Sequence, residues 1–121
     1  AYVQHRDPER RAYSLRALAA IERTSAVPRL IQSLNGDRSA RVRRSAVLGL
    51  EPFQQADPAI LPELIRALRD RSTEVRIAAV DVVSRIDDPR ARDALKARNK
   101  RERRRDVRRV LEMAMPRIEG R

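Results

Sequence analysis

Two stretches of this sequence repeat one another: DRSARVRRSAV at residues 37–47 and DRSTEVRIAAV at residues 70–80. Seven of the eleven positions are identical. Directly before each stretch the pattern Pro-x-Leu-Ile-x-x-Leu occurs, beginning at Pro28 and again at Pro62. Self-similarity at a fixed period is the signature of repeat proteins, so the chain is built from copies of one structural unit.

Each repeat predicts two helices. The first begins at a carboxylate followed by proline, as at Asp57 and Asp88, because such a carboxylate accepts from free amides and proline lacks an N–H that would need a partner. The second begins after Ser39 or Ser72. Apolar residues then recur at the spacing of one helical face, namely Val42, Ala46 and Leu50 in one repeat and Val75, Ala79, Val82, Val83 and Ile86 in the next.

The same signals predict the domain organisation. We expect one domain over residues 1–121, with a leading helix at about 8–21 and repeats at about 25–51, 57–86 and 88–118. The first residue is Ala1 rather than Met, and the final IEGR looks like a protease recognition sequence used to remove tags. Either observation suggests an excised fragment or an engineered end, and a native tail is the equal alternative.

Composition favours helices and argues against catalysis. Charged residues make up 37% of the chain, there are only three aromatic residues, and the core must therefore be aliphatic, which predicts an all-α fold. There is no cysteine, the single histidine is His5, and the three glycines are isolated. These absences exclude thiolate or histidine metal sites, a nucleophile with a histidine base and a phosphate-binding loop. We expect no enzyme activity, no metal and no cofactor.

The repeated pattern, Pro-x-Leu-Ile-x-x-Leu followed by Asp-x(4)-Val-Arg-x-x-Ala, resembles the short HEAT-like repeat, a type also found in phycobilisome lyases. The resemblance covers about Ser25 to Pro116 and implies a right-handed α-α superhelix, a HEAT-like solenoid of about three helical hairpins plus the leading helix. It also implies that the acid and the arginine of each copy are structural and tie one repeat to the next. These pairs are Asp37 with Arg43, Asp70 with Arg76 and, in a weaker third copy, Glu102 with Arg108.

The resemblance places a partner on the concave side, which the second helices of such repeats line. The positions opposite the apolar stripe include the six candidate partner-binding residues Arg44, Leu48, Ile77, Asp81, Arg109 and Met113. Their mixture of apolar and arginine side chains predicts a protein or peptide partner. The alternative is that scattered apolar residues on a surface are ordinary.

A rival site follows from charge. The formal net charge is +11, and eight basic but only two acidic residues lie between Arg98 and Arg109. Possible contacts to an anion or a nucleic acid are Arg98, Lys100, Arg101, Arg103, Arg104 and Arg105. The favoured alternative is a solvated loop and helix start that caps the end of the array.

The leading hypothesis is therefore a non-catalytic HEAT-like interaction or scaffold module, which could be an accessory domain of a larger protein such as a metallopeptidase. The alternatives are nucleic-acid binding through the C-terminal arginines and a chaperone that resembles a bilin lyase. No apolar run has the roughly 20 residues that a membrane-spanning helix needs. We expect a soluble, cytoplasmic protein without a membrane partner.

Overall fold

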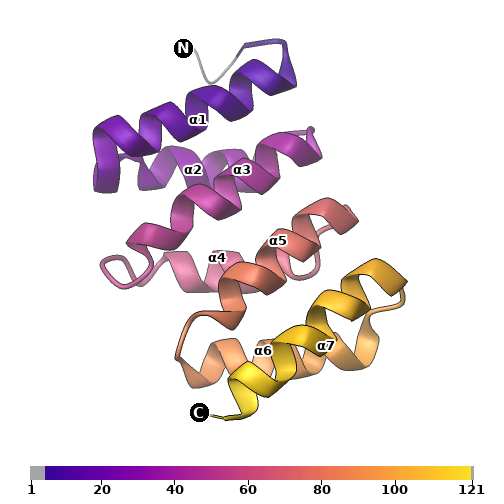
Figure 1. Cartoon of the computed structure of the whole chain (residues 1–121). Helices are drawn as coiled ribbons and strands as arrows, with labels where there is room; N and C mark the ends of the chain where they lie inside the picture. The colour runs from indigo at the N-terminus through magenta and orange to yellow at the C-terminus, as the bar shows by residue number, and fades with distance from the viewer. Residues whose placement is uncertain (1–4, 121) are drawn as a thin grey trace. The chain divides into compact units, whose positions relative to one another are not determined.

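The computed structural model describes residues 5–120, and this part of the chain contains helices and no strand (Figure 1). The prediction of an all-α fold is confirmed. The α-helices are α1 (Pro8–Glu22), α2 (Val27–Gly36), α3 (Ala40–Leu50), α4 (Ile60–Ala67), α5 (Thr73–Ser84), α6 (Pro89–Arg101) and α7 (Arg105–Glu119). Short 3-10 turns, η2 (Arg23–Ala26) and η3 (Glu51–Phe53), precede α2 and follow α3.

Aspartates cap α1 and α6, each of which begins with proline. The Asp7 carboxylate accepts a hydrogen bond from the Glu9 N–H at 3.0 Å before α1, and the Asp88 carboxylate accepts one from the Arg90 N–H at 2.8 Å before α6. Each cap satisfies an amide that the first helical turn leaves without a partner. These two starts lie where the sequence predicts them.

The start of α4 differs from the prediction. Asp57 accepts from the Ala59 N–H at 2.9 Å, but residues 57–59 form a turn and the helix begins only at Ile60. Pro62 therefore lies in the first turn of α4, where its missing N–H breaks no helical hydrogen bond.

The second helices begin directly after Ser39 and Ser72, as predicted, but neither serine side chain caps its helix. Instead, the carboxylate two residues earlier accepts from the serine amide. Asp37 Oδ1 lies 2.8 Å from the Ser39 nitrogen, and Asp70 Oδ1 lies 2.9 Å from the Ser72 nitrogen. The repeated Asp-x-Ser sequence thus fixes the turn between the two helices of a repeat.

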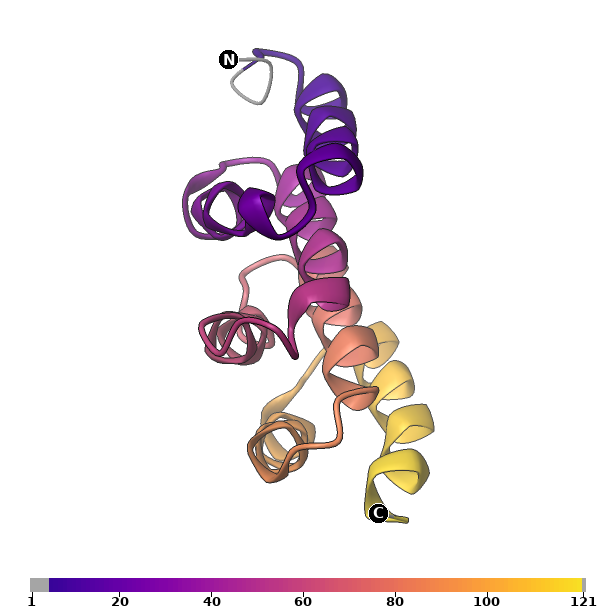
Figure 2. The same cartoon turned by 90° about the vertical axis from the view of Figure 1, so that its left-hand side faces the viewer.

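Contacts divide the chain into two compact units, and the first comprises Ala1–Ile60. Within it, α1 and α3 lie side by side, and α2 packs against α3 from the other layer (Figure 2). The helices bury aliphatic residues such as Leu15, Leu30 and Leu50. Gly49 lets α3 approach α2 closely, because a Cβ at that position would lie 3.2 Å from a methyl group of Leu30.

The second unit comprises Leu61–Arg121. Within it, α5 and α7 lie side by side, and α6 packs against both from the other layer (Figure 2). Ile118 in the last turn of α7 is buried, so the IEGR sequence begins inside the core of this unit, while Arg121 lies outside the described residues. The grouping of residues 1–121 into a single domain stays a prediction.

Candidate partner-binding surfaces

A buried ion pair lies inside the first unit. The Arg11 guanidinium on α1 donates two hydrogen bonds to the Asp37 carboxylate, with Nε to Oδ2 at 2.9 Å and Nη2 to Oδ1 at 3.0 Å. Its Nη1 donates to the main-chain carbonyls of His5 and Arg6, each at 2.7 Å. Bidentate geometry makes such a pair strong. Because its donors are occupied and it is buried, Arg11 serves the fold and is not available to a ligand.

A larger cluster lies inside the second unit. The Arg76 guanidinium on α5 donates to both carboxylate oxygens of Glu102, at 3.0 and 3.1 Å, and the Arg104 N–H donates to Oε2 at 3.1 Å. Arg98 brings a second guanidinium, whose Nε lies 3.2 Å from Oε1 without the geometry of a hydrogen bond. The Glu102 side chain is only 1% exposed. Two guanidiniums therefore depend on one buried carboxylate.

These partners set the protonation of Glu102. Burial by itself raises the pKa of a carboxyl group, because it disfavours the charged form. The hydrogen bonds from Arg76 and from the Arg104 amide, together with the positive charges of Arg76 and Arg98, outweigh burial. The pKa of Glu102 is lowered from its ordinary value of 4.5.

The arginine of each repeat also reaches the turn of its own repeat. Arg43 Nη1 donates to the main-chain carbonyl of Asp37 at 2.9 Å, and Arg76 Nη1 donates to that of Asp70 at 2.8 Å. Both bonds support the structural role that the resemblance implies for these four residues, which remains a proposal. The arginine thus holds the main chain of the acidic residue that precedes its helix.

Two details of these pairs escape sequence reasoning. The predicted pairing of Glu102 with Arg108 is wrong: within residues 5–120, Glu102 pairs with Arg76 and Arg98, and Arg108 is exposed at the start of α7. Arg11 was missed, although it occupies in α1 the place that Arg43 occupies in α3. The signal was weak because Arg10, not valine, precedes Arg11.

The residues predicted for the concave face fall on different helices. Arg44 and Leu48 lie on α3 of the first unit and are half-buried. In the second unit, Ile77 is half-buried on α5, while Met113 on α7 has 75% of its surface exposed.

The remaining residues of this predicted face differ in how they are paired. Asp81 forms an exposed ion pair with Arg85 at 2.8 Å. Arg109 on α7 is exposed. Sequence reasoning did not single out Tyr13 and Ile21 on α1, which are 72% and 79% exposed.

An arginine-lined hollow of about 390 Å³ lies at the start of α7. Its lining consists of Arg103, Arg105, Arg108, Arg109 and Glu112. The four arginines are exposed, and among the described residues none of them has an acidic side chain within ion-pair distance. This hollow presents positive charge that the fold does not neutralise.

The predicted anion-contacting residues differ in their exposure and in their ion pairs. Residues 98–101 belong to the last turn of α6, so this part of the charge run is helical and not a loop. Arg98 is held by Glu102, and the Arg104 Nε lies 3.8 Å from the Asp106 carboxylate. The exposed members that have no acidic partner among residues 5–120 are Lys100, Arg101, Arg103 and Arg105.

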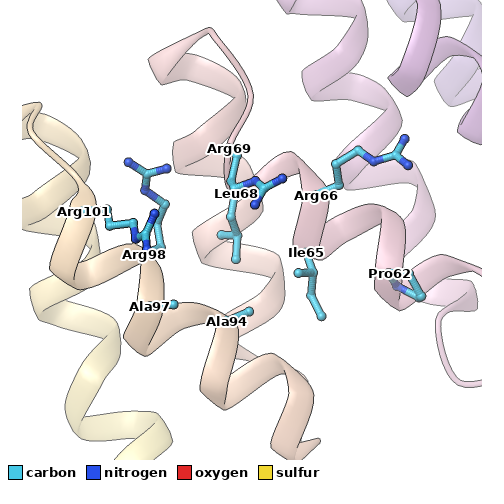
Figure 3. Close-up of a pocket in the computed structure, with 9 residues that line it drawn as sticks. All are labelled: Pro62, Ile65, Arg66, Leu68, Arg69, Ala94, Ala97, Arg98 and Arg101. Carbon is cyan, nitrogen blue, oxygen red and sulfur yellow. The ribbon is translucent and has the colours of Figure 1, made fainter.

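A groove of about 480 Å³ lies between the first helices of the second unit, on α4 with its following turn and on α6 (Figure 3). Its lining residues are Pro62, Ile65, Arg66, Leu68, Arg69, Ala94, Ala97, Arg98 and Arg101. The sequence did not reveal this groove, because the two helices that form it are about 30 residues apart and each one alone shows only an ordinary amphipathic pattern.

The acidic residues form no metal-ion cluster in the part of the chain that the structure describes. No three of its His, Asp and Glu side chains are grouped to hold a metal ion. A hydrogen bond from the Arg90 side chain, added to the one from its amide, lowers the pKa of Asp88, as expected for a helix cap. Likewise, no helix within residues 5–120 is long and apolar enough to cross a membrane.

Comparison with known families agrees with the repeats. The family described as HEAT repeats matches residues 29–116, and the family described as PBS lyase HEAT-like repeat matches residues 10–36. No curated protein matches the chain. HEAT repeats generally mediate protein interactions, and the family is typically non-catalytic. With most of its length matched and its paired helices folded as described, this chain belongs to the HEAT repeat family.

Proposed function

We propose that this chain is a non-catalytic interaction module whose second unit binds an acidic protein partner on the layer formed by α5 and α7. The observation that carries the proposal is the exposed face of α7. Arg105, Arg109 and Met113 are spaced by four residues, so they share one face of that helix. All three are exposed.

The chemistry of this face suits a protein partner. Methionine and arginine are enriched at protein interfaces, and a flexible thioether adapts to irregular apolar surfaces. An arginine that is not neutralised within its own chain can pair with a carboxylate of a partner. Arg105 and Arg109 have no acidic partner among the described residues, whereas Arg11 and Arg76 are used by the fold.

Site-specific photo-cross-linking tests this proposal. A photoreactive amino acid replaces Met113, and a matched control carries it at Lys96, which is exposed on α6. In extract of the source cells we expect a discrete cross-linked protein at position 113, absent at position 96 and lost when Arg105→Glu and Arg109→Glu are added. Cross-links that are equal at both positions, or unaffected by the charge reversal, would contradict the proposal.

Nucleic-acid binding is the second candidate, and the arginine-lined hollow at the start of α7 favours it. The free guanidiniums of Arg103, Arg105, Arg108 and Arg109 could contact successive phosphates. Fluorescence anisotropy of a labelled duplex at about 50 mM salt measures this, because affinity for the backbone falls steeply with salt. Binding that is absent at low salt rejects the candidate.

Two finer roles rest on the family alone. An accessory domain of a larger protein, such as a metallopeptidase, is consistent with a module that binds and does not catalyse. The match to the PBS lyase HEAT-like repeat supports a bilin chaperone as a further alternative. Adding a bilin to the purified chain and recording its absorbance spectrum tests this role, and an unchanged spectrum removes it.

A further inference from the structure

The groove on α4 and α6 has two chemically different sides. In the view of Figure 3, the guanidinium groups lie in the upper half, and aliphatic side chains lie below them. The aliphatic side consists of Pro62, Ile65, Ala94 and Ala97, which are exposed or half-buried. The volume of the whole groove, about 480 Å³, lies within the range of known ligand pockets, about 300–1,000 Å³.

The arginines of the groove fall into two classes. Arg66 Nη1 lies 3.5 Å from Glu63 Oε1, and Arg98 Nε lies 3.2 Å from Glu102 Oε1. The chain itself therefore supplies a carboxylate to each of these two arginines. Arg69 and Arg101 are not in ion-pair contact with any acidic side chain of the described residues. The groove therefore has two guanidiniums that a ligand could neutralise.

The preference for cations at helix C-termini explains only part of the arrangement of Arg69 and Arg101. Basic residues are favoured near helix C-termini, and Arg69 and Arg101 follow or end α4 and α6. That preference explains a cation at each helix end. It does not explain why an aliphatic strip that is exposed or half-buried, with Ile65 and Ala97, adjoins both cations in one groove.

We propose that this groove binds an acidic amphipathic segment of another protein, with its aliphatic side chains on Ile65 and Ala97 and its carboxylates paired with Arg69 and Arg101. Charge complementarity selects the occupant: the chain carries a formal charge of +11, and the groove adds apolar contact to free guanidiniums. The groove and the face of α7 are on different layers of the second unit, so this site is additional to the one proposed above.

Other occupants fit less well. A single-stranded nucleic acid needs aromatic side chains for stacking, and none lines the groove. A second copy of this chain would bring a surface with a net positive charge toward Arg69 and Arg101. Both remain as outcomes that the experiment below can reveal.

Selection from a displayed library of random peptides tests the site on the full chain. One variant, Ala97→Glu, places a negative charge in the groove at an exposed helical position. A second, Arg69→Ser with Arg101→Ser, removes the free guanidiniums. The matched control, Arg38→Ser with Arg71→Ser, removes the same charge at two exposed positions outside both proposed surfaces. A further variant, Arg105→Ser with Arg109→Ser, reports whether peptides bind the α7 face instead. Circular dichroism of each variant verifies that it remains helical.

We expect the selected peptides to combine aliphatic residues with flanking Asp or Glu, and both groove variants to weaken their binding at least about tenfold, as expected when charge-assisted hydrogen bonds are lost. The control should bind as tightly as the wild type. Selection of no binder, or of neutral or basic peptides, overturns the inference. So does self-association of the chain that Ala97→Glu abolishes, or preferential binding of single-stranded RNA.

The two proposals fail separately. Peptides whose binding is lost in the Arg105→Ser, Arg109→Ser variant but kept in the groove variants would overturn the groove inference and leave the α7 face in place. If no cross-link forms from position 113 while groove-dependent peptides are still selected, the α7 proposal is overturned and the groove inference stays in place.

Discussion

Each of the two units contains a buried arginine–carboxylate pair, but the two pairs differ in burial and in the number of arginines. In each, an arginine forms a bidentate pair with an acid 26 residues later: Arg11 on α1 with Asp37, and Arg76 on α5 with Glu102. In the first unit one guanidinium meets one carboxylate. In the second unit Arg98 adds another guanidinium, and the carboxylate is almost completely buried. Glu102 therefore forms ion pairs with two guanidiniums where Asp37 pairs with Arg11, and the Glu102 carboxylate is more deeply buried.

The two ion pairs differ in how far the stability of their unit depends on a single group. Arg11 keeps two main-chain carbonyl partners, those of His5 and Arg6, whatever happens to Asp37. Without Glu102, two guanidiniums would remain close together with no carboxylate between them. A buried charge left without its partner is costly, so the second unit should be the more sensitive one.

Removal of Glu102 should have the largest effect. We expect Glu102→Ala to lower the free energy of unfolding by about 3–5 kcal/mol, because it leaves Arg76 and Arg98 uncompensated. Urea denaturation measures the total, and amide hydrogen exchange should show the greatest loss of protection in α5 and α7. The control Glu112→Ala removes an exposed carboxylate of α7 and should change stability by less than about 0.5 kcal/mol. Equal losses in the two variants would contradict this account.

Removal of Asp37 should cost less. We expect Asp37→Ala to destabilise by about 2 kcal/mol, the scale of hydrogen bonds to a charged group, since Arg11 retains its carbonyl partners. The matched control is Glu9→Ala, which breaks the exposed pair with Arg41 at 3.2 Å and should cost less than about 1 kcal/mol. A larger loss for Asp37→Ala than for Glu102→Ala would reverse the comparison.

Acid should affect the second cluster in a predictable direction. The pKa of Glu102 in the folded state is below its ordinary value of 4.5, so the unfolded chain binds this proton more tightly. Its stabilising contribution is present above the ordinary value and is lost as pH falls through the folded-state pKa. Urea denaturation at several pH values between about pH 3 and pH 6 gives the free energy of unfolding at each. This free energy should decrease more steeply with falling pH for the wild type than for Glu102→Gln. Parallel curves would show that Glu102 does not contribute.

Replacement of Arg98 should have a smaller effect than removal of either carboxylate. Its Nε makes no hydrogen bond to Glu102, and Arg76 already occupies both carboxylate oxygens. We expect Arg98→Leu to change the free energy of unfolding by less than about 1 kcal/mol, because the packing of an aliphatic side chain offsets the lost attraction. Differential scanning calorimetry can measure this change. A loss close to that of Arg76→Met would make Arg98 an equal partner in the cluster.

The elements that sequence predicts best are those with local causes. The helix starts at Pro8, Ala40, Thr73 and Pro89 follow from caps, prolines and the repeated Asp-x-Ser turn. The start of α4 was placed too early, because Asp57 and Pro58 carry the same signal as Asp88 and Pro89 yet lead into a turn. A cap motif reports that amides are satisfied, and it does not report whether the helix continues from that residue.

The binding surfaces were harder to predict, because they depend on elements distant in sequence. Met113 was identified from the helical wheel of α7 alone and is indeed exposed. The groove needs Ile65 from α4 beside Ala97 from α6, and no local pattern places them together. Charge runs mislead for the same reason: neighbouring arginines such as Arg98 and Arg101 differ in role, because only the first meets a buried carboxylate.

We infer that the arginines form two populations: one stabilises each unit from within, and the other is free for an acidic partner. Urea denaturation of four matched variants, Arg11→Met, Arg76→Met, Arg69→Met and Arg101→Met, tests it most directly. We predict losses of about 2–5 kcal/mol for the first two and changes within about 0.5 kcal/mol for the last two. Overlapping values for the two pairs would contradict the division.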